Sequence, residues 1–202
     1  PESLLGNLSL ADLIPENLAA TPDPIVTGSA LTVRWSTANR GNATTAGPLT
    51  DRVVVRNGSG SVVATASTTD STGPLAPNQS RARELILQLP DGAAANGALT
   101  VEVSADSTGT IREANAAGTG EANNLAIVAV TGTLAPYPDL QPQSFQTTVA
   151  TWAPGASIEL RWNTANSGTR AATGPWAERL VVSNASRRVV VLDTSLTHAA
   201  SL

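Results

Sequence analysis

Apolar and polar residues alternate in short runs along the first two thirds of the chain. Leu31, Val33 and Trp35 share one face of a strand, and the residues between them are polar. Further apolar or alternating runs, each bounded by turn residues, lie at 13–18, 52–56, 62–64, 85–89, 99–103 and 125–130. Asn57-Gly58 is typical of a hairpin turn. No run has helical periodicity. Seven short strands predict an all-β, two-sheet sandwich of immunoglobulin-like architecture.

A domain-length repeat organises the chain. Residues 12–63 align without gaps with residues 139–190, at an offset of 127, and 20 of these 52 positions are identical. The longest shared motif is Arg34-Trp35-x-Thr37-Ala38-Asn39-x-Gly41, which recurs as Arg161-Trp162-x-Thr164-Ala165-Asn166-x-Gly168. This period is too long for a solenoid repeat, so each unit should be an independent domain. We expect a complete sandwich at 11–130, a proline-stiffened linker at 131–138, and the N-terminal half of a second sandwich at 139–202.

The second unit has no counterparts of the strands at 85–89, 99–103 and 125–130 before residue 202. A half sandwich exposes an apolar face and open sheet edges. Two explanations stay open: the polypeptide continues beyond this segment, or strands of another copy of the chain complete the fold by strand addition. The chain holds no methionine, even at position 1, which indicates an interior piece of a larger protein. Its expected partners are neighbouring repeats of the same polypeptide and other copies of the chain.

Composition narrows the function classes. Charged residues are 14% of the chain, the net charge is −4 and no basic run occurs, which argues against a nucleic-acid partner. No apolar stretch approaches the roughly 20 residues of a membrane helix, so membrane insertion is not expected. The absence of cysteine excludes disulfides and thiolate metal sites within the segment.

Catalytic motifs are missing from the sequence. His198 is the only histidine, and the first repeat has no matching one. No nucleophile elbow, triad context or phosphate-binding loop is present. The sequence therefore predicts a non-enzymatic protein without a cofactor.

One acidic and amide-rich segment is a candidate calcium site. Its carboxylate and amide oxygens are ligands that calcium prefers, and they fall within one connection between strands. The candidate ligands are Asp106, Glu113, Asn115, Glu121, Asn123 and Asn124. Their spacing is not that of a helix-loop-helix calcium motif. The alternative is a structural loop, because Asp and Asn also hydrogen-bond to their own backbone in turns.

Four tryptophans fall into two groups. Trp35 and Trp162 occupy equivalent apolar positions and are expected in the core. Trp152 and Trp176 replace Ile25 and Leu49 of the first repeat, so they could pack in the core or stack on a sugar or protein ligand.

The recurring arginines are expected on outward faces, solvated or paired with the adjacent acidic residue. These are Arg34, Arg52, Arg161 and Arg179, with Asp51 or Glu178 as the expected partner.

The repeat resembles a known family. Asp-Leu near the domain start, the block from Gly28 through Arg34-Trp35 to Asn39-x-Gly41, and the ending from Asp106 to Asn123-Asn124 are similar to bacterial cell-adhesion-related domains, the CARDB family. The resemblance implies β-sandwiches that occur in tandem in large exported or surface proteins. The expected function is an extracellular structural or adhesive spacer at the bacterial cell surface. The alternative is an accessory module that binds carbohydrate or protein beside an enzyme or toxin domain outside this segment.

Overall fold

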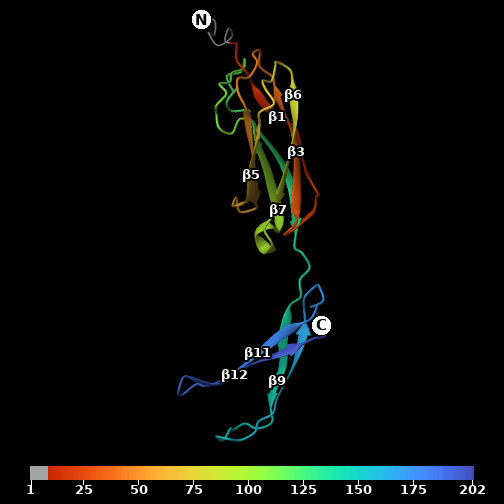
Figure 1. The fold of residues 1–202 in the computed structure, drawn as a ribbon, viewed down its shortest axis with the longest axis vertical. Helices are drawn as coiled ribbons and strands as arrows, with labels where there is room; N and C mark the ends of the chain where they lie inside the picture. The colour runs from red at the N-terminus through yellow and green to blue at the C-terminus, as the bar shows by residue number, and fades with distance from the viewer. Residues whose placement is uncertain (1–8) are drawn as a thin grey trace. The chain divides into compact units, whose positions relative to one another are not determined.

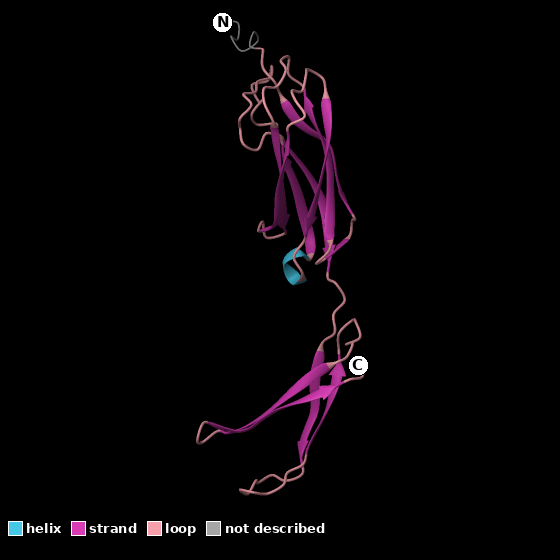
Figure 2. Cartoon of the chain, viewed as in Figure 1, coloured by secondary structure: helices cyan, strands magenta, loops and turns pink. Residues whose placement is uncertain are grey.

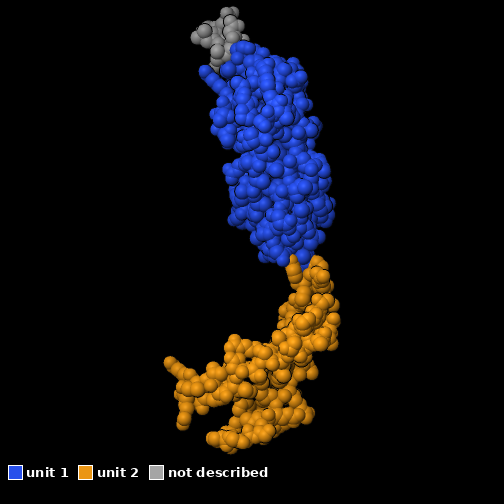
Figure 3. Space-filling model, viewed as in Figure 1, with its two compact units in different colours: residues 1–135 blue, residues 136–202 orange. Residues whose placement is uncertain are grey.

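The chain forms two compact units, divided between Ala135 and Pro136 (Figure 3). The structure is a computed structural model that describes residues 9–202. The first unit ends at Ala135, and the second unit comprises residues 136–202. None of the helical segments in the described range has the length and hydropathy needed to cross a membrane.

The first unit is a two-sheet sandwich (Figures 1 and 2). One sheet has the strand order β1-β3-β6, and the other has the order β2-β8-β7-β4-β5. The pairs are antiparallel, except that β2 runs parallel to β8. The strands are β1 Leu13–Thr21, β2 Ile25–Val26, β3 Ala30–Asn39, β4 Leu49–Asn57, β5 Val62–Asp70, β6 Ser80–Gln88, β7 Gly97–Ser104 and β8 Leu125–Thr133. The predicted all-β sandwich is confirmed.

Alternation along the strands builds the core between the two sheets. On β3, Leu31 and Val33 are fully buried and Trp35 is 2% exposed, while the intervening side chains are exposed or half-buried. Val53 and Val55 of β4 face them from the opposite sheet as part of the same apolar cluster. Burial of each such side chain stabilises the fold by about 1.5–3 kcal/mol. The sandwich is therefore held by its own core without disulfides.

All seven predicted strands are present, and the structure adds two short elements. β2 spans only two residues, because prolines at 22 and 24 precede it and leave no periodic pattern to detect. A 3-10 helix at Gly92–Ala95 begins where the Asp91 carboxylate accepts a hydrogen bond from the Gly92 backbone, 2.8 Å. Four residues are too few for a helical period.

The repeated Asn-x-Gly motif closes the start of each unit against its second long strand. The Asn39 side-chain oxygen accepts hydrogen bonds from the Asp12 and Gly41 backbones. Asn166 accepts the equivalent bond from the Gly168 backbone, and a second one from Asp139. A Cβ at Gly41 would overlap the backbone of residues 10–12. Close approach of two backbones therefore explains why the motif requires glycine.

The first unit extends further than predicted. Residues 131–133 belong to β8 rather than to a linker, because Thr131 pairs with Ala98 and Gly132 pairs with Gly97. The division between the units falls within the predicted 131–138 segment, after Ala135. The alternation Val128, Val130 marks the strand only up to residue 130, since Thr131-Gly132-Thr133 carries no apolar side chain.

The second unit repeats the first four long strands of the sandwich. It consists of β9 Leu140–Thr147, β10 Leu160–Asn166, β11 Trp176–Asn184 and β12 Val189–His198. β9 pairs with β10, and β11 pairs with β12, as β1 pairs with β3 and β4 with β5. Within residues 136–202 the only buried residue is Ala172, and Phe145 is 59% exposed. This unit has the strands of a sandwich without its core.

Candidate functional site

The predicted calcium ligands lie at the end of the first unit where the chain enters the sandwich. We call this group the end cluster: Asp106, Glu113, Asn115, Glu121, Asn123 and Asn124, together with Asp12. Asp106 follows β7 in a tight turn with φ of 37°. Its carboxylate accepts hydrogen bonds from Thr108, from Thr110 and from the Ile111 backbone, the last at 2.7 Å. Asp106 therefore shapes its own loop.

Glu113 is a buried acid of the end cluster and is 5% exposed. One carboxylate oxygen accepts a hydrogen bond from the Leu13 backbone, and the other accepts one from the Asn124 side chain, 2.9 Å. Burial raises the pKa of Glu113 to about 7, against these two hydrogen bonds, and the nearby charges of Glu121 and Asp106 add to the rise. Glu113 therefore ties the connection before β8 to the start of β1.

Asp12 completes the end cluster, although it was not among the predicted ligands. It is 4% exposed, and its Oδ1 accepts hydrogen bonds from the side chains of Asn115 (3.3 Å) and Asn123 (3.0 Å). Its recurrence as Asp139 was a signal that could have identified it. The side-chain oxygens of Asn123 and Asn124 are buried and have no hydrogen-bond partner within the described residues.

The end cluster does not have the donor arrangement of a calcium cage. No group of three or more carboxylate or histidine side chains converges among residues 9–202. The carboxylates of Asp106 and Glu113 already accept hydrogen bonds at both oxygens, and Glu121 accepts one from the Glu113 backbone. Calcium requires six to eight oxygen ligands around one point. The contacts support a structural loop, and calcium binding stays a prediction.

A buried carboxylate lies inside the sandwich beside the predicted core tryptophan. Asp51 of β4 is fully buried, and its Oδ2 accepts hydrogen bonds from Trp35 Nε1 (3.1 Å) and Thr37 Oγ1 (2.5 Å). Arg83 of β6 places its Nε 3.2 Å from the same oxygen. Arg83 also lies 3.5 Å from the Asp70 carboxylate. Burial acts to raise the pKa of Asp70, but hydrogen bonds from Thr72 and Arg81 and the positive charge of Arg83 outweigh burial and lower this pKa.

The recurring arginines lie on outward faces as expected, but the expected ion pairs with Asp51 and Glu178 are wrong. Asp51 points into the core, whereas Arg52 follows it on the outer face and bonds to Thr65. The outward-facing Arg34 pairs with Glu84 across the sheet, Arg161 with Glu159, and Arg179 with Asp193. The period of two along a strand explains the error, because adjacent residues point to opposite faces. By the same rule Asp51, Val53 and Val55 of β4 all point into the core.

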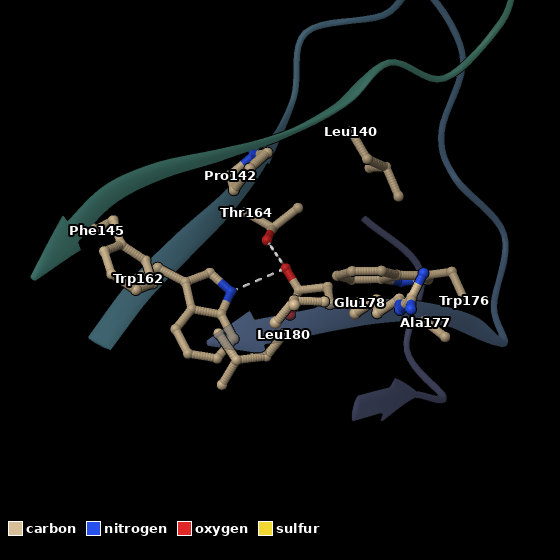
Figure 4. A pocket seen from close by; sticks show the side chains of 11 residues that line it. Leu140, Pro142, Phe145, Trp162, Thr164, Trp176, Ala177, Glu178 and Leu180 are labelled. Carbon is tan, nitrogen blue, oxygen red and sulfur yellow. Dashed lines mark hydrogen bonds between the residues drawn. The ribbon is translucent and has the colours of Figure 1, made fainter. Parts of the chain in front are cut away.

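The second unit repeats this carboxylate site in an open form. A pocket of about 540 Å³ lies between its two hairpins and is lined by Leu140, Pro142, Phe145, Trp162, Trp176, Glu178 and Leu180, among others (Figure 4). Glu178 accepts hydrogen bonds from Trp162 Nε1 (3.1 Å) and from Thr164 Oγ1, as Figure 4 shows. The Thr164 bond is the largest cause of its lowered pKa.

The two candidate ligand-binding tryptophans lie in different surroundings. Trp152 is 42% exposed in the loop between β9 and β10, and its Nε1 donates to the Val149 carbonyl. Trp176 is half-buried on β11, lines the pocket and stacks on His198 at 4.1 Å between ring centroids. Phe145 stacks on Trp162 in the same pocket and was not predicted. Only its alignment with Leu18, a residue packed against the first core, could have indicated it.

His198 takes a position that sequence alignment did not reveal. Trp176 pairs with His198, whereas its counterpart Leu49 pairs with Asp70. The His198 Nε2 lies 2.9 Å from the Glu178 carboxylate. The β11–β12 register is shifted by one residue relative to the β4–β5 register, so the only histidine of the chain stands where the first unit has a second acid.

Comparison with known proteins gives one family and a set of similar solved structures. The CARDB family model matches residues 10–127, which is more than half of the chain. A CARDB domain from Pyrococcus furiosus, described in complex with di-metal ions, is 18% identical with a TM-score of 0.45, over 64% of this chain and 99% of that one. Beta-glucosidase 3B from Thermotoga neapolitana is 18% identical with a TM-score of 0.38, over 61% of this chain and 16% of that one. No curated protein matches.

The matched range covers the sandwich up to the first residues of β8 and holds the end cluster and the buried Trp35–Asp51 site. The chain therefore belongs to the CARDB family.

Proposed function

We propose that this chain is part of an extracellular structural or adhesive spacer, built from tandem sandwiches of a larger secreted or surface protein and without catalytic activity. The observation that carries the proposal is the path of the chain through the first unit. The chain enters beside the end cluster, where Ala11 pairs with Glu113, and leaves at the opposite end beside Gly97 (Figure 1). Domains whose two termini lie at opposite ends can be linked in tandem.

Hydrogen bonds hold the C-terminal segment of the first unit against the β2 region, as a spacer under tension requires. The Thr27 backbone donates to the Thr133 carbonyl (2.8 Å), and the Ala135 backbone donates to Thr27 Oγ1 (3.1 Å). The parallel pairing of β2 with β8 lies beside these bonds. Because the strands are parallel, tension between the two ends of the unit loads these bonds in shear, so several must break together.

Stretching single molecules from both ends tests this proposal. We expect one high-force unfolding event for the first unit. Thr27→Val removes the acceptor of the Ala135 bond and should lower the unfolding force, whereas Thr65→Val, in β5 away from the exit, should not. Unfolding of the first unit at forces no higher than those of the second would contradict a load-bearing role. Labelling of intact cells by antibodies against the first unit tests the surface location.

The alternative is a module that binds carbohydrate or protein through exposed aromatic side chains. Trp152 favours it, since this ring is 42% exposed on a loop. A glycan array read with the unmodified chain and with Trp152→Ala distinguishes the two functions. A spacer gives no signal, whereas a binding module gives a signal that Trp152→Ala removes.

We further propose that the end cluster is a hydrogen-bonded connection that holds the entry of the chain, and that it needs no ion. Glu113, Asp12 and their amide partners link residues that are about a hundred positions apart in sequence. Such long-range bonds fix the N-terminal end of β1, which among the described residues has β3 as its one neighbour in the sheet.

A further inference from the structure

We propose that Asn96 of the folded first unit is a site of spontaneous deamidation, where water converts the side-chain amide to a carboxylate, and that the fold protects Asn57. This modification goes beyond the spacer role and does not rest on it. Asparagine followed by glycine reacts readily in this way, because glycine has no Cβ to hinder its backbone nitrogen. The chain contains two such pairs, at 57–58 and 96–97.

The reaction needs only the two neighbouring residues and water. The Gly97 backbone nitrogen loses its proton and forms a bond to Cγ of Asn96. The bond from Cγ to Nδ2 breaks, and the nitrogen leaves as ammonia with that proton. Water then opens the resulting cyclic imide at either carbonyl, which gives aspartate or isoaspartate and releases a proton. No oxidant or cofactor is consumed.

Asn96 is held through its backbone alone. It lies exposed at the C-terminal end of the 3-10 helix, where its backbone donates to the Ala93 carbonyl at 3.2 Å. Its side chain has no hydrogen-bond partner among residues 9–202. The ψ of Asn96 is 141°, so the Gly97 nitrogen must turn towards Cγ before it attacks. A Cβ at Gly97 would meet no atom within 4 Å, which leaves room for that rotation.

Asn57 also precedes a glycine, but its side chain is fixed. Its Oδ1 accepts hydrogen bonds from the Ser59 backbone (3.2 Å), the Ser59 hydroxyl (2.7 Å) and the Ser61 backbone (3.0 Å). Its Nδ2 donates to the Ala94 carbonyl at 3.1 Å. Formation of the cyclic imide removes the amide from these partners, so their bonds must break first. The two pairs therefore share a sequence motif and differ in their contacts.

The product alters the end of the first unit where the chain leaves it. Gly97 pairs with Gly132 of β8, and a Cβ at Gly132 would overlap the Ala95 carbonyl. Isoaspartate at position 96 lengthens the backbone between Ala95 and Gly97 by a methylene group. Because the backbones are in close contact here, the isoaspartate form should unfold at a lower temperature than the Asn96→Asp chain, which gains only the charge.

The test is incubation of the full chain in mildly alkaline buffer, followed by trypsin digestion and mass spectrometry. Cleavage after arginine places Asn57 in peptide 57–81 and Asn96 in peptide 84–112. We expect Asn96 to convert at least about tenfold faster than Asn57, because the hydrogen bonds of Asn57 raise its barrier. In urea, where both side chains are free, the two rates should agree. A chain digested without incubation corrects for deamidation during digestion.

Two variants and one label sharpen the comparison. Asn96→Gln should abolish the conversion in peptide 84–112 and leave that of Asn57 unchanged. Ser59→Ala removes the hydroxyl donor to Asn57 and should speed its conversion, with no effect at Asn96. Labelling of peptide 84–112 by an isoaspartate-specific carboxyl methyltransferase identifies the isoaspartate product.

Three results would overturn the proposal. Equal rates at Asn57 and Asn96 in the folded chain would remove the role of the contacts. Conversion of Asn96 in urea but not in the folded chain would show that the fold protects both sites. Equal unfolding temperatures of the isoaspartate form and the Asn96→Asp chain would contradict the effect on the backbone contact. The unfolding force of freshly prepared chain does not depend on these results, so the spacer function is tested separately.

Discussion

The two units carry the same motif and differ in what covers it. In the first unit, the Trp35–Thr37–Asp51 contacts are buried between two sheets and neutralised by Arg83. In the second unit, the Trp162–Thr164–Glu178 contacts are formed as well, yet they line an open pocket. The hairpins and these hydrogen bonds are thus the same in both units. Burial comes from β6, β7 and β8, which are remote in sequence.

The largest expected difference between the units comes from removing the two tryptophans. Trp35→Ala should destabilise the first unit by about 3–5 kcal/mol, because it leaves a cavity in a closed core. Trp162→Ala should cost the second unit much less, since its ring is only half-buried. Urea unfolding followed by resolved NMR signals of each unit measures both. Equal losses would mean that Trp162 is covered in solution.

Removing the carboxylate beside the core tryptophan should give the next largest difference in stability between the two units. Asp51→Asn leaves Arg83 buried without one of its two acidic partners and should destabilise the first unit by about 2–4 kcal/mol. Glu178→Gln leaves no buried arginine behind, so the second unit should lose little. The control is Asp193→Asn, at an exposed ion pair of the same unit. A small effect of Asp51→Asn would show that Asp70 alone compensates Arg83.

The pH dependence of stability should run in opposite directions in the two units. The folded pKa of Glu113, about 7, lies above the 4.5 of an unperturbed glutamate. The folded first unit therefore holds a proton that the unfolded chain has released, and the stability from Glu113 is full below pH 4.5 and lost as the pH rises to about 7. We expect a loss of about 1–3 kcal/mol over this range. Glu178 has a lowered pKa, so its contribution is present above pH 4.5 and lost on acidification.

Thermal unfolding between pH 4.5 and 8 measures these slopes. Glu113→Gln should flatten the slope of the first unit, and Glu84→Gln, at an exposed ion pair of β6, should leave it unchanged. Glu121→Gln should reduce the slope in part, because the charge of Glu121 adds to the raised pKa of Glu113. Asp70 does not interfere, because its lowered pKa acts only below pH 3.8. A first unit that gains stability with rising pH would contradict the assignment.

The smallest expected effect is that of calcium. Because the carboxylates of the end cluster are already hydrogen-bonded, added calcium should leave the unfolding temperature of a 1–135 fragment unchanged, and so should chelators. A rise that Glu113→Gln and Asp106→Asn abolish would instead show that the end cluster rearranges to bind the ion.

Alternation was sufficient to predict most of the first unit. Leu31, Val33 and Trp35 marked β3, and Asn57-Gly58 marked the hairpin that joins β4 to β5. The two-residue β2 was missed because it has no periodicity, and the last residues of β8 because Thr131-Gly132-Thr133 carries no apolar side chain. The sites were less predictable: Asp12 joins Asn115 and Asn123 only because residues 103 and 111 positions apart meet at one end of the sandwich.

The sequence by itself determined the strand pattern, the duplication, the core tryptophan and membership of an all-β class, because these depend on periods of two and on direct self-comparison. Only the tertiary structure decided that Asp51 and Arg83 share the core, that Glu113 is buried against Leu13 and Asn124, and that His198 stands where Asp70 would be. Each of these depends on register between strands that are distant in the chain. Register depends on turn geometry and on packing, and a shift of one residue is enough to change the partner.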